Sequence, residues 1–226
     1  MKAQAIIVAA GRGSRFGSDM PKQFLELKGK PILAHAVAAF EAHADIESVI
    51  IVGAEDWLFY IAEDIVGKYG LTKVQKIIPG GKERQDSVEA GLTALDDPSL
   101  PVLIHDGARP LVSAGVIDRV LAGMAEADAC IPAVPLHDTI KRVQGREVVQ
   151  TIDRETLRAV QTPQGFWPEA LAGLLQQART EALHVTDEAS LTEHYGGRVH
   201  WVEGDPANLK ITTTFDLKIA HLILEE

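Results

Sequence analysis

Apolar runs of strand length alternate along the chain with longer segments whose apolar residues recur at helical spacing. The strand-like runs cover residues 5–9, 49–52, 74–78, 102–105, 129–134 and 199–202. The helical patterns cover residues 32–43, 56–69, 85–95, 114–127, 168–178, 187–195 and 214–224. This alternation is typical of a mostly parallel sheet covered by helices. We therefore predict an α/β fold built on one Rossmann-like open sheet, with helices on both of its faces.

Three of the runs suit the centre of that sheet. The first, second and fourth carry apolar residues at successive positions, so both of their faces favour burial, as in central parallel strands. Pro168 suits the first turn of its helix, and Thr186 or Asp187 suits a helix cap. No internal repeat, low-complexity tract or linker interrupts the pattern, which predicts a single domain over residues 1–226.

One stretch breaks the alternation and predicts a β-hairpin. Residues 138–143 and 147–152 flank the turn Gln144-Gly145-Arg146, and a glycine-containing turn between two β-rich runs is typical of a hairpin. Its side chains have little core-like content, and an isolated hairpin is only marginally stable in water. We therefore expect an arm at about 137–153 that packs on a partner subunit, and so a homodimer.

The composition is that of an ordinary globular protein, and it narrows the classes of partner. Of 226 residues, 46% are hydrophobic and 24% charged, and the formal net charge is −10. A general nucleic-acid binder gains its affinity from clustered Lys and Arg that neutralise phosphates. The acidic balance therefore argues against nucleic acid as a partner, and it makes any local cluster of cations more informative.

Cysteine usage and hydropathy predict a cytoplasmic protein. The single cysteine, Cys130, rules out an intrachain disulfide and suits a reducing compartment. Its apolar neighbours favour a buried thiol over a reactive one. No apolar stretch reaches the roughly 18 to 20 residues of a membrane span, and the first residues resemble a strand more than a signal peptide.

A glycine-rich loop follows the first strand directly and predicts a phosphate-binding site. Residues 9–17 read Ala-Ala-Gly-Arg-Gly-Ser-Arg-Phe-Gly, and such loops let backbone N–H groups approach phosphates without Cβ clashes. The Rossmann spacing needs a third glycine where Phe16 stands, and the P-loop ending Gly-Lys-Ser/Thr is missing. Arg12, Arg15 and Lys22 add cations, as a triphosphate site requires. The alternative is a surface loop with solvated arginines.

Asp106 ends a buried strand beside this loop, where a carboxylate suits Mg²⁺ held against phosphate oxygens. Its alternative role is a helix cap for the segment that follows. His105 and Asp106 are also a candidate metal or acid–base pair. Adjacent strand residues point to opposite faces, however, which favours a structural role for His105. Arg109 suits either phosphate binding or an ion pair that shapes the loop.

Motifs along the whole chain resemble one enzyme family. The opening, with Gly11, Gly13 and Arg15 followed by Pro-Lys-Gln-Phe at 21–24, is similar to the sugar-nucleotide and alditol-phosphate nucleotidyltransferases. Five further segments resemble the 2-C-methyl-D-erythritol 4-phosphate cytidylyltransferase family of non-mevalonate isoprenoid synthesis. They are residues 80–88, 105–110, 138–141, 186–190 and 208–212.

The resemblance assigns residue roles that the residues alone do not. On the nucleotide side it implies contacts from the loops around the triphosphate and cytosine, namely from Ala9, Ala10, Gly11, Gly13, Gly81, Lys82, Ser87 and Asp106. On the acceptor side it implies contacts from Asp106, Arg109, Thr139, Arg154, Thr162 and Lys210. Thr139 and Arg154 would reach across from the partner's arm. Lys82 departs from the family, where an acidic residue is common, but recognition through the backbone tolerates that change.

The expected reaction is in-line attack of a substrate phosphate oxygen on the α-phosphorus of CTP, with loss of pyrophosphate. A phosphate monoester is already an anion near neutral pH, so positioning and charge stabilisation carry the catalysis. Arg15 and Lys22 would stabilise the α-phosphate, and Lys210 would assist from the substrate side. Mg²⁺ at Asp106 would be the cofactor. From sequence alone Lys210 has the default interpretation of a surface lysine.

Other interpretations remain open at the level of sequence. The acceptor could be ribitol phosphate or a sugar 1-phosphate, and nothing in the residues selects cytosine. A dinucleotide-dependent oxidoreductase is disfavoured by Phe16 and by the lack of an acidic residue ending the second strand. A regulatory nucleotide-binding protein without catalysis is a further alternative. Asp187 and Glu188 are consecutive helix positions that do not face each other, so we predict a helix-start role and no catalytic dyad.

Overall fold

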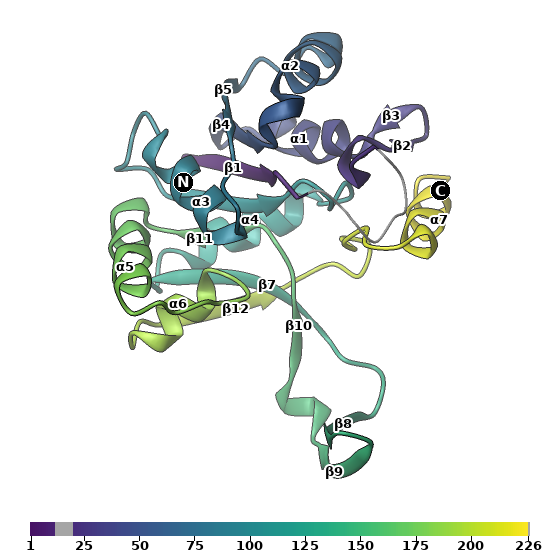
Figure 1. Ribbon diagram of the computed structural model, residues 1–226, viewed down its shortest axis with the longest axis vertical. Helices are drawn as coiled ribbons and strands as arrows, with labels where there is room; N and C mark the ends of the chain where they lie inside the picture. Colours follow the sequence, from purple (N-terminus) through teal and green to yellow (C-terminus); the bar gives the residue numbers. More distant parts are fainter. Residues whose placement is uncertain (12–19, 226) are drawn as a thin grey trace.

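A twisted eight-stranded sheet forms the centre of the molecule (Figure 1). The computed structural model describes residues 1–11 and 20–225. The hydrogen-bonded order is β10-β7-β11-β6-β1-β4-β5, and β12 pairs with β7. The strands are β1 (Ala3–Ala9), β4 (Ile46–Gly53), β5 (Val74–Pro79), β6 (Val102–Asp106), β7 (Ala129–Pro135), β10 (Arg158–Val160), β11 (Gln164–Phe166) and β12 (Val199–Glu203). β1, β4 and β6 are central and parallel, as predicted.

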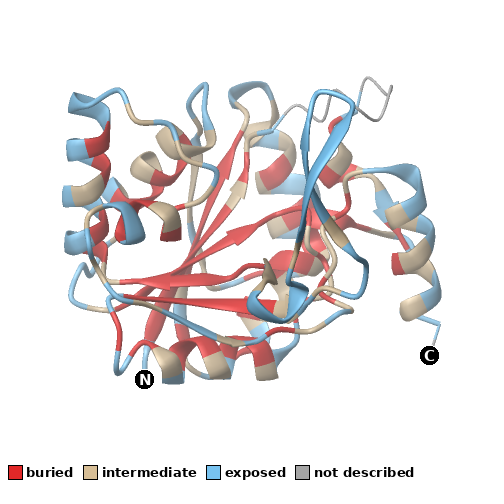
Figure 2. Ribbon diagram, turned by 90° about the horizontal axis from the view of Figure 1, so that it is seen from below, coloured by how far each residue is buried: buried red, intermediate tan, exposed pale blue. Residues whose placement is uncertain are grey.

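Helices cover both faces of this sheet, which confirms the predicted fold class. Ile7 of β1 belongs to the core cluster beneath one set of helices, and the neighbouring Ile6 belongs to the cluster on the other face. The first face carries α1 (Ile32–Ala42), α4 (Ala114–Gly123) and η4 (Ile61–Gly67). The second carries α3 (Arg84–Thr93), α5 (Pro168–Thr180) and α6 (Ala189–His194). In Figure 2 the central strands are accordingly coloured as buried.

The predicted helix at 56–69 is helical, but it is not one regular α-helix. It consists of a 3₁₀ turn, η3 (Glu55–Trp57), a short α-helical turn, α2 (Leu58–Tyr60), and the π-helical η4. Ile61 and Ile65 still face the core, fully buried. Over so short a run, apolar spacing does not distinguish a turn of 3.6 residues from a wider one.

Sequence periodicity missed several short elements. β10 and β11 are three residues each and run antiparallel to β7, and β11 also pairs antiparallel with β6. A small ribbon of β2 (Glu26–Leu27) and β3 (Lys30–Pro31) and the 3₁₀ turns η2 (Lys22–Phe24) and η5 (Arg154–Thr156) were also not predicted. Segments of two or three residues carry too few positions for a periodic signal. β11 matters for function, because it lies directly beside β6.

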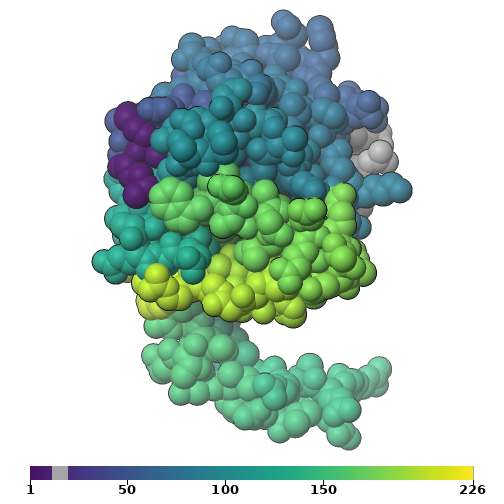
Figure 3. Space-filling model, turned by 90° about the vertical axis from the view of Figure 1, so that its left-hand side faces the viewer, coloured from purple at the N-terminus to yellow at the C-terminus, as the bar shows by residue number. Residues whose placement is uncertain are grey.

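The predicted hairpin is present and projects from the body (Figures 1 and 3). Its strands, β8 (Ile140–Gln144) and β9 (Glu147–Ile152), form a two-stranded sheet and pair with no other strand of the described residues. Gly145 has φ of 59°, the left-handed conformation that a tight turn needs and that glycine adopts readily. Three arm valines, Val143, Val148 and Val149, are more than half exposed. These three valines give the otherwise polar arm an exposed apolar surface.

Cys130 lies fully buried in β7, as the sequence predicts, and burial raises the pKa of its thiol to about 11. The C-terminal helix α7 (Thr214–Ile223) begins with a capping box formed by Thr213 and Asp216. None of the helices in the described part of the chain combines the length and apolarity of a membrane span.

The carboxyl ends of β1, β5 and β6 lie at one edge of the sheet, where the loops that follow them converge. Gly107 donates to the carbonyl of Val8 across this edge at 2.9 Å. The segment 208–212, far along the chain, is fastened there by the bond from the Ile211 N–H to the carbonyl of Ala108, also 2.9 Å. Open α/β sheets bind ligands in such a place.

Candidate active site

A cavity at this edge gathers most of the residues predicted to bind a nucleotide. Its walls come from the end of β1, from η2, from the loop before α3, and from the ends of β6 and of the 208–212 segment. The predicted residues that line it are Ala9, Ala10, Gly11, Lys22, Gly81, Lys82, Ser87, Asp106 and Lys210. We call this space the first cavity. Gly13 and Arg15 lie outside the described residues.

Gln23 braces the stem of the glycine loop, a role that the sequence did not reveal. Its side chain is buried, and Nε2 donates to the carbonyls of Ala9 at 2.7 Å and Gly11 at 3.0 Å. The adjacent Lys22 lines the first cavity. The η2 turn thus holds the stem of the loop, residues 9–11, through Gln23 and presents a cation to the cavity through the preceding Lys22.

The opposite wall is built for close approach of backbone. A Cβ at Gly80 would stand 2.5 Å from the Ala10 Cβ and 2.7 Å from the Ser87 Oγ, so only glycine fits there. The buried Ser87 hydroxyl accepts from the Gly81 N–H and donates to the Glu83 carbonyl, both at 3.2 Å. These bonds hold the loop between β5 and α3 in one conformation over the cavity.

Asp106 lies at the centre of a cluster of cations. Lys210 Nζ contacts its Oδ2 at 2.8 Å, Arg109 Nε lies 3.5 Å from Oδ2, and Arg84 Nε lies 3.5 Å from Oδ1. Burial alone would raise the pKa of Asp106, but Arg84 and Lys210 outweigh it and hold that pKa below its ordinary value. The carboxylate is therefore ionised throughout the physiological range. Lys210 thus lines the first cavity and pairs with Asp106, although its side chain remains 39% exposed.

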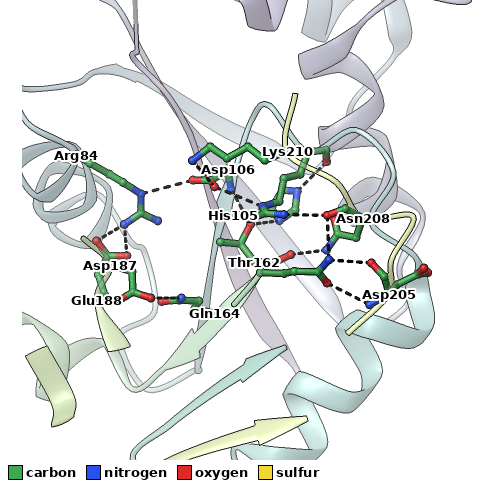
Figure 4. A network of polar contacts seen from close by, with 12 residues as sticks. Arg84, His105, Asp106, Thr162, Gln164, Asp187, Glu188, Asp205, Asn208 and Lys210 are labelled. Atoms are coloured by element: carbon green, nitrogen blue, oxygen red, sulfur yellow. Dashed lines mark hydrogen bonds and ion pairs between the residues drawn. The ribbon is translucent and has the colours of Figure 1, made fainter. Parts of the chain in front are cut away.

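A second cavity lies on the other side of Asp106. It is lined by Thr162 and Gln164 from around β11, by Thr186 and Asp187 before α6, and by Arg109. Arg84, Asp106 and Lys210 line both cavities. We call these three the junction residues, because they form the wall that the two spaces share. Figure 4 shows the polar network around them.

His105 has the structural role that its strand position predicted. It is fully buried against Phe40, with ring centroids 5.0 Å apart. Its Nδ1 lies 2.9 Å from the Thr162 Oγ1 and its Nε2 lies 3.0 Å from the Arg109 carbonyl. The same Thr162 oxygen accepts from the Asp106 N–H at 3.1 Å, so its proton is free for Nδ1, which assigns the ring proton to Nε2. His105 thereby positions Thr162 and the loop after Asp106.

This environment predicts a pH-dependent stability. Burial lowers the pKa of His105 to about 4, so the folded protein keeps the ring neutral while the unfolded chain protonates it below about pH 6.5. The contribution of His105 to the free energy of unfolding is therefore fully present above pH 6.5 and is lost as the pH falls towards 4. At pH 5 this group lowers the free energy of unfolding by about 2 kcal/mol. Urea unfolding at pH 7.5 and pH 5 should show a smaller loss for His105→Gln than for wild type. Equal losses would contradict the assignment.

Arg109 and Thr162 are tied to the 208–212 segment. Arg109 Nη1 donates to the Asn208 carbonyl at 2.8 Å, and the Asn208 side chain donates to the Thr162 carbonyl, also at 2.8 Å. Burial lowers the pKa of Arg109, and Asp106 opposes that shift. Of the two roles predicted for Arg109, this structure contains the ion pair that shapes the loop. Its position on the second cavity keeps phosphate binding as a prediction.

The comparisons with known proteins agree with this geometry. The sequence model of the 2-C-methyl-D-erythritol 4-phosphate cytidylyltransferase family matches residues 3–226. The chain belongs to this family. The enzyme of that name from Halalkalibacterium halodurans is 45% identical over 226 residues, which cover 100% of this chain and 98% of the relative. Membership makes the chain a cytidylyltransferase of isoprenoid precursor synthesis.

Solved structures of the same family share the fold. The 4-diphosphocytidyl-2C-methyl-D-erythritol synthase from Anaerococcus prevotii aligns with a TM-score of 0.86 at 29% identity, covering 100% of this chain and 99% of that one. The 2-C-methyl-D-erythritol 4-phosphate cytidylyltransferase from Thermus thermophilus aligns with a TM-score of 0.82 at 33% identity, covering 100% of both chains. The similarity therefore extends over the whole chain, arm included.

Two predicted cytidylyltransferase residues lie far from the cavities of their own chain. Thr139 and Arg154 are exposed on the arm, and neither lines the first or the second cavity. Arg154 donates to the carbonyl of His137 and lies 3.7 Å from the Glu155 carboxylate, both within the arm. A role for these residues in catalysis therefore requires a second copy of the chain.

One pair of site residues escaped the sequence analysis. Glu188 is 1% exposed, and both of its carboxylate oxygens accept from Arg84 Nη1. The neighbouring Asp187 does have the predicted helix-start role, since its Oδ1 accepts from the Ser190 N–H at 3.1 Å. Both partners of the ion pair stand in motifs that carried the resemblance, yet they are 104 residues apart, and no local pattern joins them.

Proposed function

We propose that this cytidylyltransferase carries out its family's reaction at the wall between the two cavities. CTP would occupy the first cavity and 2-C-methyl-D-erythritol 4-phosphate the second, and CMP would pass from one to the other with release of pyrophosphate. The observation that carries the proposal is that Arg84, Asp106 and Lys210 line both spaces. Two cations and a carboxylate thus stand where the substrates must meet.

The nucleotide side suits a triphosphate with its base against the loop after β5. The close packing at Gly80, with the Ser87 hydroxyl beneath it, leaves the backbone of Gly81 and Lys82 facing the cavity. Backbone and hydroxyl groups of this kind can hydrogen-bond the edge of a base. Ala9, Ala10, Gly11 and, outside the described residues, Gly13 would face the phosphates through their amides.

The chemistry requires little beyond charge and position. An acceptor phosphate oxygen forms a bond to the α-phosphorus, and the bond to the bridging oxygen of the β-phosphate breaks. The acceptor phosphate is largely dianionic at neutral pH, because its second pKa is near 6, so no general base is needed. Lys22, with Arg15 outside the described residues, would stabilise charge on the α-phosphate from the first cavity. Lys210 would hold the acceptor phosphate from the wall.

The residues present fit a magnesium ion. Mg²⁺ usually takes one or two carboxylates together with phosphate oxygens and waters, and Asp106 supplies one carboxylate beside the first cavity. Among the residues that the structure describes, its Oδ1 has only the more distant contact with Arg84, whereas Oδ2 is taken by Lys210. Within the described residues no group of three or more His, Cys, Asp or Glu side chains stands ready for a metal. Bound there, Mg²⁺ would neutralise the triphosphate.

A homodimer joined through the arm would complete the acceptor site. The exposed valines of the arm are available to pack on a partner surface, and Thr139 and Arg154 line neither the first nor the second cavity. In a twofold dimer each arm would lie over the partner's second cavity. Arg154 would then bind the acceptor phosphate together with the partner subunit's Lys210.

Subunit complementation tests this arrangement. Homodimers of Arg154→Ala and homodimers of Lys22→Ala are each expected to have low activity, because each kind lacks a cation at both of its sites. In heterodimers of the two, one site has an intact body and an intact arm. Half of randomly paired dimers are mixed, so co-expressed chains should recover about a quarter of wild-type activity. If recovery were absent in verified heterodimers, the arm would not act across the interface.

Pyrophosphate release tests the reaction itself. Purified protein is assayed with Mg²⁺, CTP and 2-C-methyl-D-erythritol 4-phosphate, with ribitol 5-phosphate and the three other nucleoside triphosphates in parallel. Release with the first pair alone is the expected result. Release with a different pair would retain the mechanism and replace the substrate. Folded protein that releases pyrophosphate from no pair would contradict the proposed function.

A further inference from the structure

The carboxylate of Glu188 is a charged group that is almost completely buried. It stands at the start of α6, its side chain is 2% exposed, and it lines neither cavity. Among the residues that the structure describes, Arg84 is the only cation paired with it. An isolated carboxylate in such a place would be strongly disfavoured, so this one depends on Arg84.

Arg84 connects that buried carboxylate to the active site. Nη1 contacts both oxygens of Glu188, while Nε faces Asp106 Oδ1 at 3.5 Å (Figure 4). A guanidinium is planar and rigid, so holding Nη1 against Glu188 restricts where Nε can lie. Arg84 is also the first residue of α3, directly after the loop that forms the nucleotide wall. Glu188 therefore determines where the Arg84 charge lies at the junction.

The charges around Asp106 indicate why the contact between Glu188 and Arg84 matters for the site. In the described part of the chain three cations pair with this one carboxylate, and the closest is Lys210 at 2.8 Å, whereas Arg84 stays at 3.5 Å. Without Glu188 the Arg84 guanidinium would have Asp106 as its nearest anion. It would then move onto Oδ1, which in the described part of the chain pairs with Arg84 alone, at 3.5 Å. Glu188 thus keeps the carboxylate of Asp106 available.

We propose that Glu188 is a positioning residue of the transfer reaction, which acts through Arg84 to set the position of Asp106 at the junction. The inference rests on the proposed function, since the junction matters only if the substrates meet there. The alternative is that the Arg84–Glu188 pair only joins α3 to α6. That role would affect stability and leave the chemical step unchanged.

Steady-state kinetics of Glu188→Gln separate the two roles. Gln keeps the size of the side chain and removes the charge that holds Arg84. We expect kcat to fall about 10- to 100-fold, with KM for CTP changed less than about threefold, because Asp106 is misplaced mainly for the transition state. Glu89→Gln is the matched control: Glu89 pairs with Arg179 from the same helix α3, on the surface and away from both cavities. It should keep wild-type kcat.

A double-mutant cycle then tests whether Glu188 acts through Arg84. Once Arg84→Gln has removed the charge, the further change Glu188→Gln should cost nothing, so the double variant should be no slower than Arg84→Gln alone. Losses that multiply would mean independent roles and would overturn the inference. If either single variant fails to fold, the double variant, which buries no lone charge, is compared with wild type. The double variant should keep kcat within about tenfold of wild type, because no Arg84 charge is left to move onto Asp106, and a larger loss would overturn the inference.

A crystal structure of Glu188→Gln tests the inference independently of the reaction. The Arg84 guanidinium is expected to move towards Asp106, so that the distance from Nε to Oδ1 becomes shorter than 3.5 Å. Unchanged positions of Arg84 and Asp106 would overturn the inference even if the enzyme is active. If wild type releases no pyrophosphate while this movement occurs, the proposed function fails and the positioning role of Glu188 stands.

Discussion

Replacing Lys22 by alanine is expected to lower kcat about 100- to 1,000-fold while KM for CTP changes by less than about threefold. Lys22 lines the first cavity from the rigid η2 turn, beside the braced glycine loop. The α-phosphate gains charge density chiefly in the transition state, so a cation placed there contributes to the chemical step more than to binding. Single-turnover rates at saturating CTP and acceptor measure the effect.

The controls for Lys22 separate charge from structure. Lys22→Arg keeps the charge and should retain more activity than alanine, whereas Lys218→Ala removes an exposed lysine of α7 and should leave kcat unchanged. Urea midpoints show whether the alanine variant is folded. A Lys22→Ala enzyme with wild-type kcat and a raised KM for CTP would make Lys22 a ground-state ligand of the triphosphate, contrary to the mechanism.

The second large effect is expected from Asp106→Asn. The substitution keeps the shape of the side chain but leaves Arg84, Arg109 and Lys210 facing one another without their shared carboxylate. Loss of one partner from a buried ionic cluster costs about 3 kcal/mol of stability. Activity should fall about 1,000-fold, because the proposed magnesium ligand and the counter-charge of Lys210 are lost together.

Two measurements distinguish these consequences of Asp106→Asn. The urea midpoint reports the stability, and a Mg²⁺ titration of the rate reports the ligand. We expect the rate to stay low at any Mg²⁺ concentration, since added metal does not restore the position of Lys210. Asp96→Asn, which removes one partner of an exposed pair with Lys76, serves as the control and should change stability by less than about 1 kcal/mol. Rescue of Asp106→Asn by excess Mg²⁺ would leave Asp106 with metal binding alone.

The regular spacing of apolar residues predicted the central elements of the fold correctly. Runs that are apolar on both faces, such as 5–9 and 102–105, predicted the central strands β1 and β6, because burial on two sides requires them. The end of such a strand is fixed by the same pattern, which placed Asp106 at the carboxyl edge. Strand alternation also separated His105 from Asp106 correctly, one towards the core and Phe40, the other towards the cavities.

The residues that complete the site depended on contacts that no local pattern records. β11 is too short for a periodic signal, yet its pairing with β6 brings Thr162 and Gln164 beside Asp106. Lys210 would be an ordinary surface lysine without the bond that docks Ile211 onto Ala108. The family resemblance pointed to Thr162 and Lys210. It did not indicate which tertiary contacts place them beside Asp106.

What the sequence determined by itself is the sheet, its two covered faces and the hairpin, since each follows from local spacing or turn chemistry. Only the tertiary structure decided which charges share a site. Arg84 and Glu188 are 104 residues apart, and no local pattern indicates that burial leaves this carboxylate paired, among the described residues, with Arg84. The strength of an ion pair depends on the solvent that surrounds it, and burial is a property of the folded molecule as a whole.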